Sequence, residues 1–164
     1  GIVASFHPVR HIKGNSIEMP RLVNNNYLVR IDSVFRTYIP TLSIVFRNKT
    51  REIDLKLYQE APYGDRALIS FLSNFGDFYC LNQIMATYRI HNGGMVNGNS
   101  RFWYFKNSIK TLRICKKIVK KENQRFVVKK IKGRTNQAIV EMIKKLEFLN
   151  CLYFIFLKIK WYLK

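Results

Sequence analysis

Apolar residues in the first half of the chain occur in short runs that have the length of β-strands. Ile2 to Phe6 is such a run, and Ser43 to Phe46, which follows Pro40, is another. Phe78 to Leu81 and Ile84 to Ile90 have the same character. Because β-branched and aromatic residues favour strands, we predict a strand for each run.

The segments between these runs are less regular. Clusters of glycine and asparagine at Gly14-Asn15 and Asn24-Asn25-Asn26 predict a polar connection. The residues from Asn48 to Glu52 predict a polar turn. Leu28 to Phe35 fits either a helix or a strand, and its pattern leaves both open.

Helical periodicity appears first at Gly64 to Leu72, and Gly76 is expected to end that helix. Beyond residue 100 the spacing of three and four continues over a longer stretch. The predicted apolar stripe of the first long helix consists of Phe102, Phe105, Ile109, Leu112, Cys115 and Val119. A second helix is predicted from about Asn136, with a stripe of Ile139, Met142, Ile143 and Leu146.

The distribution of charge divides the chain at the same place. The 164 residues carry 29 Lys and Arg against 10 Asp and Glu, a net charge of +19. Residues 101–164 hold 18 of the basic side chains and 3 of the acidic ones. We therefore predict an α/β piece over residues 1–100, followed by a basic α-helical tail over residues 101–164. Such a charge attracts polyanions, which include nucleic acid and anionic membrane surfaces.

The tail ends in an apolar stretch, Phe148 to Leu157, that is followed by Lys158, Lys160, Trp161 and Tyr162. The stretch is well short of the roughly 20 residues that cross a bilayer. Lysine beside tryptophan and tyrosine is typical of a helix that lies in the membrane interface, which is one interpretation. The other is a solvated helical hairpin that packs on the rest of the chain.

Several kinds of site are not indicated by the sequence. Cys80, Cys115 and Cys151 form no CxxC pair, which predicts neither a zinc site nor disulfides and fits a reducing, cytoplasmic setting. The sequence also has no glycine-rich phosphate loop, no catalytic Ser-His-Asp arrangement and no Asp-x-Asp motif. The chain opens directly on an apolar run, which we interpret as a strand entered within a domain, so we expect a fragment of a longer protein.

Among the acidic residues of the first hundred, Asp65 is the strongest candidate for chemistry. It lies in a Gly-Asp step at the predicted start of a helix. A carboxylate there can take a proton from a bound hydroxyl as a general base, or it can be the N-cap of the helix. Its position alone favours the cap.

Three further polar residues lie at or near the ends of predicted strands. His91 precedes Gly93-Gly94, where an imidazole can reach a metal ion or a diphosphate, or can simply pack on the surface. Arg47 and Arg89 can each hold a phosphate group or tie the edge of a sheet.

Three motifs occur in a fixed order. They are Ile39 to Asn48 (Ile-Pro-Thr-Leu-Ser-Ile-Val-Phe-Arg-Asn), Gly64 to Leu68 (Gly-Asp-Arg-Ala-Leu) and Met85 to Gly94 (Met-Ala-Thr-Tyr-Arg-Ile-His-Asn-Gly-Gly). Together they make residues 1–100 resemble the C-terminal half of bacterial family-2 glycosyltransferases, inverting enzymes with a Rossmann-like A-type fold. Residues 101–164 share with these enzymes only the general presence of basic helices.

The resemblance implies a role for each matching residue. Asp65 would be the general base that deprotonates the acceptor hydroxyl, so the resemblance reverses the interpretation from cap to base. His91 would face the diphosphate of the nucleotide-sugar and its divalent ion, Mg²⁺ or Mn²⁺, as a metal ligand, with Arg89 on the same side. Arg47 and Arg66 would support a saccharide or lipid-linked acceptor.

The family binds its donor and metal mainly through an N-terminal half that ends in Asp-x-Asp, and this sequence lacks that motif. The resemblance therefore implies the acceptor-side half of an enzyme of cell-envelope polysaccharide synthesis. It would be cytoplasmic, at the inner face of the membrane, and inactive as 164 residues alone. The alternative is a non-catalytic basic module that binds an anionic membrane or, by stacking, nucleic acid through Phe102, Trp103, Tyr104 and Phe105.

Overall fold

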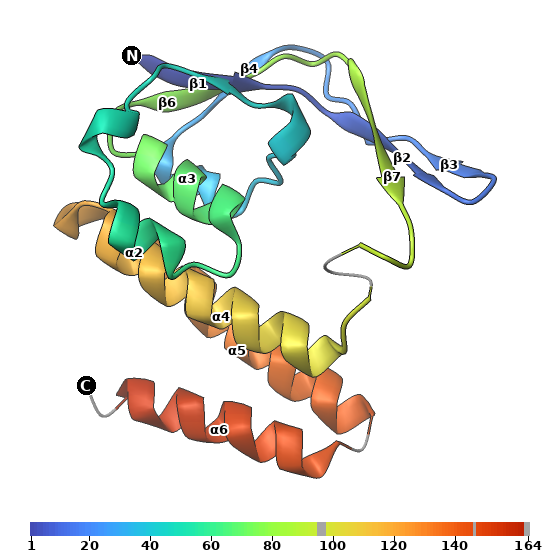
Figure 1. Ribbon diagram of the computed structural model, residues 1–164, viewed down its shortest axis with the longest axis vertical. Coiled ribbons are helices and arrows are strands. Elements are labelled where there is room, and N and C mark those ends of the chain that lie inside the picture. Colours follow the sequence, from blue (N-terminus) through green and yellow to red (C-terminus); the bar gives the residue numbers. More distant parts are fainter. Residues whose placement is uncertain (95–97, 146, 163–164) are drawn as a thin grey trace.

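The computed structural model describes residues 1–94, 98–145 and 147–162. It is a mixed α/β structure built in layers, with two small β-sheets on one side and helices on the other (Figure 1). This arrangement confirms the predicted α/β class.

The larger sheet has the strand order β4-β6-β1-β5. Its central pair, β1 and β6, is parallel, whereas β4 and β5 pair antiparallel with β6 and β1 at the two edges. The strands are β1 (Ile2–Phe6), β4 (Tyr27–Val29), β5 (Val45–Phe46) and β6 (Asp77–Cys80). The runs that predicted strands at residues 2–6 and 78–81 therefore form the centre of this sheet.

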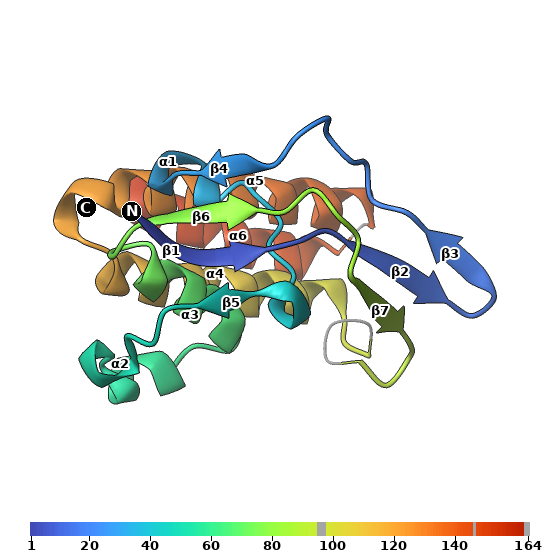
Figure 2. The ribbon, with the colours of Figure 1, turned by 90° about the horizontal axis from the view of Figure 1, so that it is seen from above.

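The smaller sheet has the order β3-β2-β7 and is formed by β2 (Val9–Lys13), β3 (Ser16–Glu18) and β7 (Ala86–Ile90). The chain runs from β1 into β2 and from β6 into β7, so the same two segments lie parallel in both sheets (Figure 2). The prediction of a polar connection was wrong at its start, where β2 and β3 form a hairpin. Gly14 makes the turn with φ of 56°, a left-handed conformation that glycine adopts without steric cost.

Two further segments are each divided between two elements. The pattern of Leu28 to Phe35 was compatible with either a helix or a strand. The segment contains the end of β4 and the short helix α1 (Ile31–Val34). In the predicted strand at residues 43–46 only Val45 and Phe46 are extended, because the 3₁₀ helix η1 (Thr41–Ser43) precedes them and Ser43 Oγ donates to Pro40 O. The polar turn that was predicted next contains η2 (Thr50–Glu52), and α2 (Leu55–Gln59) follows.

The first predicted amphipathic helix is confirmed as α3 (Gly64–Leu72). It lies beneath the larger sheet and buries Ala67, Ile69, Phe71 and Leu72 (Figure 1). The helix ends before Gly76, which lies in the turn that leads to β6. A Cβ at that position would overlap the carbonyl of Gly1, so only glycine lets the turn pass so close to the start of β1.

The predicted stripe of the first long helix is buried in α4 (Arg101–Ile118) and at its C-cap, Val119, except for Phe102, which is half-buried. Ser100 caps α4, since its Oγ accepts a hydrogen bond from Trp103 N at 3.1 Å. The next helix, α5 (Gln124–Lys144), follows η3 (Lys121–Asn123) and begins well before the predicted Asn136. Its buried residues are Val127, Ile131, Thr135, Ala138 and Met142.

The stripe predicted for this segment of α5 is confirmed in part. Of its members Met142 is buried, Ile139 is half-buried and Ile143 is exposed, whereas Leu146 lies outside the described residues. The reason is that the segment predicted as a start is the second half of a longer helix, whose packing face is set by its partners α4 and α6.

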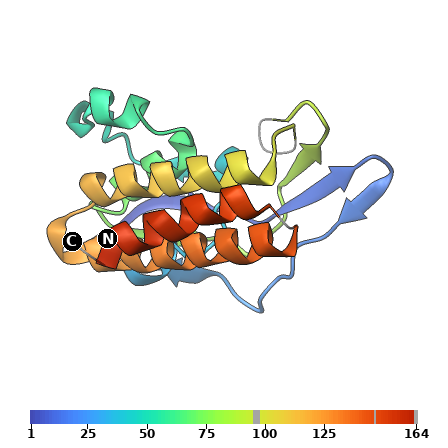
Figure 3. The ribbon, with the colours of Figure 1, turned by 90° about the horizontal axis from the view of Figure 1, so that it is seen from below.

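The last helix, α6 (Phe148–Tyr162), packs on α5 and lies farthest from the sheets (Figures 1 and 3). Cys151, Phe154 and Leu157 are buried on its inner side. One hydrophobic cluster joins these residues to the core under the larger sheet. All three cysteines carry free, buried thiols. In the described ranges no helix combines the length and the apolar character needed to cross a membrane.

Candidate functional site

Asp65 lies in the first turn of α3 rather than at its cap. The N-cap residue is Tyr63, whose side chain makes no capping hydrogen bond, so the prediction that Asp65 is the N-cap was wrong. Gly64 leaves room at the helix start, because a Cβ there would come within 3.1 Å of Tyr58 Oη. The Asp65 side chain is exposed at the positive end of the helix macrodipole, which favours its negative charge.

A residue distant in sequence helps to orient the Asp65 carboxylate. Thr41, from η1, donates its hydroxyl to Oδ2 at 2.9 Å. The backbone N–H of Arg66 donates to Oδ1 at 2.7 Å. Each carboxylate oxygen therefore accepts one hydrogen bond, which leaves about two of its four lone-pair sites for a ligand.

Aromatic rings from three other segments gather beside this carboxylate. The ring of His11, on β2, lies 6.2 Å from that of Tyr38 and 5.7 Å from that of Tyr88, on β7. Burial raises the pKa of Tyr38, and the negative charges of Tyr88 and Asp65 raise it further, whereas the charge of Arg66 lowers it. Tyr38 is therefore within electrostatic range of Asp65, and β7, which carries Tyr88, contacts η1, which carries Thr41. We call Asp65, Thr41, His11, Tyr38 and Tyr88 the Asp65 cluster.

Asp65 also lines a pocket of about 150 Å³ between the start of α3 and the helices α4 and α5. Arg66, Lys130 and Arg134 give this pocket a positive charge, and Tyr63 and Tyr104 line it as well. Asp65 is thus an exposed carboxylate at the edge of a pocket that is lined by both cationic and aromatic side chains.

Tyr63 has an unusual environment in this pocket. Its hydroxyl is buried and has no hydrogen-bond partner among the described residues. Burial raises its pKa to about 12, and the negative charges of Tyr104 and Asp65 contribute to the rise, whereas Arg134 opposes it.

Replacing Tyr63 by phenylalanine is expected to leave the free energy of unfolding at pH 7 within about 0.5 kcal/mol of the wild-type value, because the hydroxyl has no hydrogen bond to lose. The folded state holds the phenol proton more tightly than the unfolded state does. The wild type therefore keeps its full stability below pH 10, where the phenol is protonated in both states, and loses stability as the pH rises towards 12, because the unfolded phenol ionises first. Urea denaturation between pH 9 and pH 12 should show a smaller alkaline loss in Tyr63→Phe than in the wild type. Equal alkaline losses of stability in the two proteins would contradict the raised pKa of Tyr63.

His91 and Arg89 lie at the end of the smaller sheet. Arg89 is on β7, where it pairs with Ile12 of β2, and His91 follows the strand; both side chains are exposed. Within residues 1–94, 98–145 and 147–162, no three His, Cys, Asp or Glu side chains converge to hold a metal ion. The expected ion, Mg²⁺ or Mn²⁺, takes several oxygen ligands, so His91 alone does not fit a metal site.

The two arginines that were expected at the acceptor differ in their contacts. Arg47 Nε donates to Ile2 O at 2.9 Å, which ties the edge strand β5 to β1, the sheet-edge alternative for this residue. Arg66 lines the pocket next to Asp65. The structure therefore brings Arg66 and Asp65 together and leaves Arg47, Arg89 and His91 outside that pocket.

The sequence identified Asp65 but not the other members of its cluster as site residues. Thr41 lies within the first motif, and its Pro-Thr step is the only signal that pointed to it. Nothing in the local sequence marks His11, Tyr38 or Tyr88, because they come from separate strands and a loop that only tertiary packing brings together.

Comparisons with models of protein families, with curated proteins and with solved structures found no match to this chain.

Proposed function

We propose that this chain is the acceptor-side part of an inverting glycosyltransferase in which Asp65 is the general base. The observation that supports this proposal best is the Asp65 cluster: an exposed carboxylate at a helix start, oriented by Thr41, beside the rings of His11, Tyr38 and Tyr88. Aromatic rings offer flat apolar surfaces with polar edges, which suit the faces of a sugar ring.

The proposed reaction is a single displacement. Asp65 takes the proton of an acceptor hydroxyl while that oxygen forms a bond to the anomeric carbon of the donor sugar. The bond between this carbon and the nucleotide diphosphate breaks at the same time, and the configuration inverts. Oδ1 and Oδ2 keep lone pairs for the hydroxyl after their bonds to Arg66 N and Thr41 Oγ1.

The parallel pairs β1–β6 and β2–β7 are compatible with the Rossmann-like A-type fold of such enzymes. The sequence has no Asp-x-Asp motif, and the described residues form no metal site. We therefore propose that the residues which hold the nucleotide-sugar and its divalent ion come from outside these 164 residues, and we derive no step through the ion.

The test uses the natural gene product, purified from its source cells. Its intact mass is measured, and the protein is incubated with a panel of nucleotide-sugars and with saccharide and lipid-linked acceptors from the same cells. We expect release of the nucleotide that depends on an acceptor, and a product whose new bond has the opposite anomeric configuration to the donor by NMR. Acceptor-dependent transfer with retention would contradict the mechanism, and absence of transfer across the panel would contradict the function.

A second function, binding to an anionic membrane surface, is favoured by the outer side of α6. Large apolar side chains are exposed there, and Leu149 is 83% and Phe156 63% exposed. They lie beside Leu152, Ile155 and Ile159 on a helix that also carries Lys158 and Lys160. Exposed apolar side chains combined with a strongly basic segment are typical of a helix that lies in the membrane interface.

Replacing both Leu149 and Phe156 by serine is expected to weaken binding to vesicles that contain phosphatidylserine by at least tenfold, since about 1.4 kcal/mol of lost burial is enough for that factor. Replacing Leu55 of α2, which is 62% exposed, by serine is the matched control and should leave vesicle binding unchanged. Vesicle sedimentation at physiological salt measures both. Equal binding by all three proteins would exclude α6 as the contact.

Stacking on nucleic-acid bases has less support, because its candidate aromatic residues are engaged in packing. Phe105 is buried. Phe102 lies edge-on to Phe154, with ring centroids 5.6 Å apart, and Trp103 lies edge-on to Tyr63 at 6.3 Å.

A further inference from the structure

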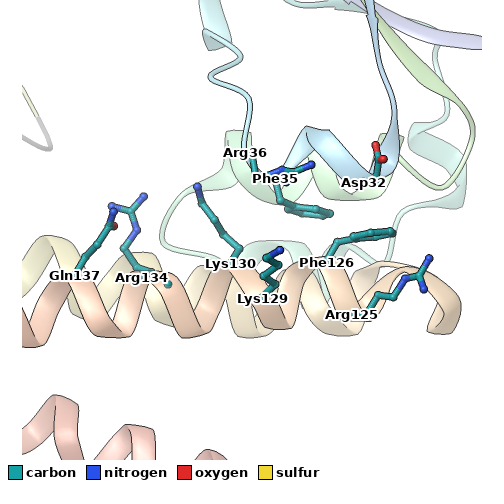
Figure 4. Close-up of a pocket in the computed structure, with 10 residues that line it drawn as sticks. Asp32, Phe35, Arg36, Arg125, Phe126, Lys129, Lys130, Arg134 and Gln137 are labelled. Atoms are coloured by element: carbon teal, nitrogen blue, oxygen red, sulfur yellow. The ribbon is translucent and has the colours of Figure 1, made fainter.

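A second and larger cavity lies between the α1 segment and α5. It has a volume of about 610 Å³ and is separate from the rings of the Asp65 cluster. Lys129, Lys130 and Arg134 point from α5 towards the side on which α1 lies, with Arg134 farther along α5 beside Gln137, and Arg36 lies across the cavity from α5 (Figure 4). Arg125 lines the same cavity nearer the start of α5. We call this cavity the basic cleft.

The charge of the basic cleft is poorly balanced by the protein. Five cationic side chains line it, and Asp32 is the only acid among its lining residues. None of the five forms an ion pair with a carboxylate of the described residues. The carboxylate of Asp32 instead accepts a hydrogen bond from Ser33 Oγ at 3.0 Å.

The helix places these cations close together. Arg125 and Lys129 are four residues apart on α5, as are Lys130 and Arg134, so each pair lies on one side of the helix where like charges repel. Burial lowers the pKa of Lys130, and the charges of Arg134 and Arg66 lower it further. Arg134 donates to Tyr104 Oη at 2.9 Å, but its Nε is buried without a partner among the described residues.

Gly133 provides an independent observation. It is an exposed glycine inside α5, between Lys130 and Arg134, and it lines the basic cleft. A Cβ at this position would meet no atom within 4 Å, and the residue has no positive φ. Glycine inside a helix is less favourable than alanine, so neither packing nor backbone geometry explains it. Because Gly133 has no side chain, the space between the side chains of Lys130 and Arg134 stays open.

We propose that the basic cleft binds a diphosphate group, and, resting on the proposed function, that this group belongs to a diphosphate-linked sugar acceptor. Lys130 and Arg134 line both the basic cleft and the pocket that contains Asp65, so the two spaces are adjacent. A diphosphate held by these two residues places the group attached to it next to the proposed general base.

A diphosphate suits the cleft better than the other common anions. The cations of α5 extend from Arg125 to Arg134, which are nine residues apart and about 13 Å apart along the helix axis, so two linked phosphates engage more of them than one does. Lys and Arg together supply point charge and paired N–H donors for phosphate oxygens. Nucleic acid is less suitable, because the cations line a cavity whose walls include Phe35 and Phe126 rather than an open stripe.

Isothermal titration calorimetry in 150 mM salt tests the proposal with inorganic diphosphate as the probe. The test variant is Lys130→Gln with Arg134→Gln. The matched control is Lys106→Gln with Lys110→Gln, an exposed pair with the same four-residue spacing on α4 that removes the same charge. We expect at least tenfold weaker binding in the test variant and unchanged binding in the control. Equal weakening in both would show that only net charge matters and would overturn the proposal.

A variant that keeps all the charges tests the cavity itself. Gly133→Leu is expected to reduce diphosphate affinity at least tenfold while circular dichroism shows an intact fold, because leucine fills the space between the cations. Unchanged affinity in Gly133→Leu would overturn the proposed position. The titration measures binding and not sugar transfer, so a failure of the proposed catalytic function leaves this measurement intact.

Further titrations identify the source of the diphosphate. Inorganic phosphate should bind at least tenfold more weakly than diphosphate, and equal affinity would overturn the diphosphate assignment. Farnesyl diphosphate that binds more tightly than UDP would support a lipid-linked acceptor. The reverse order would identify a soluble nucleotide and would overturn the acceptor assignment. A 20-nucleotide RNA that binds while diphosphate does not would overturn the proposal in favour of nucleic acid.

Discussion

Replacing Asp65 by asparagine is expected to slow sugar transfer by the natural protein roughly 10²- to 10⁴-fold, the range that a positioned general base contributes. Asparagine has the same shape, and its amide oxygen can still accept the hydrogen bond from Thr41. What it lacks is the capacity to take a proton from the acceptor hydroxyl. The measurement is the steady-state rate of transfer at saturating donor, together with the dissociation constant of the nucleotide-sugar, which should stay unchanged.

The chain offers a matched control for this substitution in Asp54. That residue is also exposed, but it is a true N-cap, since its Oδ1 accepts a hydrogen bond from Leu57 N at 3.0 Å at the start of α2. Asparagine caps helices about as well as aspartate, so Asp54→Asn should preserve both stability and transfer. If Asp65→Asn behaves like Asp54→Asn, the carboxylate of Asp65 is not the base.

Replacing Phe154 by alanine is expected to lower the free energy of unfolding by about 3–5 kcal/mol, the usual cost of removing a buried aromatic side chain. Phe154 is completely buried on the inner side of α6. Its ring packs edge-on against Phe102, at 5.6 Å between centroids, and Phe105, at 6.3 Å. The substitution therefore leaves a cavity between α6 and α4. Urea or thermal denaturation followed by circular dichroism measures the change.

Phe156, on the same helix, provides the comparison. It is 63% exposed on the outer side of α6, so Phe156→Ala should change the free energy of unfolding by no more than about 0.5 kcal/mol. A small effect of both substitutions would mean that α6 does not pack on the other helices in solution. A large effect of both would mean that the outer side of α6 is covered.

The elements predicted well are those whose pattern is local and complete. The apolar run of β1 and the spacing of three and four in α3 and α4 identified these elements, because strand and helix periodicities are set within a few residues. Errors arose where the pattern was weak. The hairpin of β2 and β3 has few buried side chains, and its pairing with β7 across the chain stabilises it.

The candidate site shows the same division between local and distant information. Asp65 was identified from its position in a Gly-Asp step, but the interpretation as a cap was wrong because Tyr63 is the N-cap and Gly64 begins the helix. The hydrogen bond from Thr41 joins residues 24 positions apart, and no periodicity reports such a contact. The basic tail was recognised from composition, whereas the cleft that gathers part of it depends on Arg36 from the other half of the chain.

Sequence patterns therefore predicted the α/β class, the basic character of residues 101–164, the central strands and the first two amphipathic helices. These properties follow from composition and from short-range periodicity, which every residue carries with it. Tertiary structure alone decided which side of α6 is buried, which rings stand beside Asp65 and which cations meet across the basic cleft. Such contacts depend on how separate elements pack, and packing is a property of the whole chain because each face is buried only when its partner is in place.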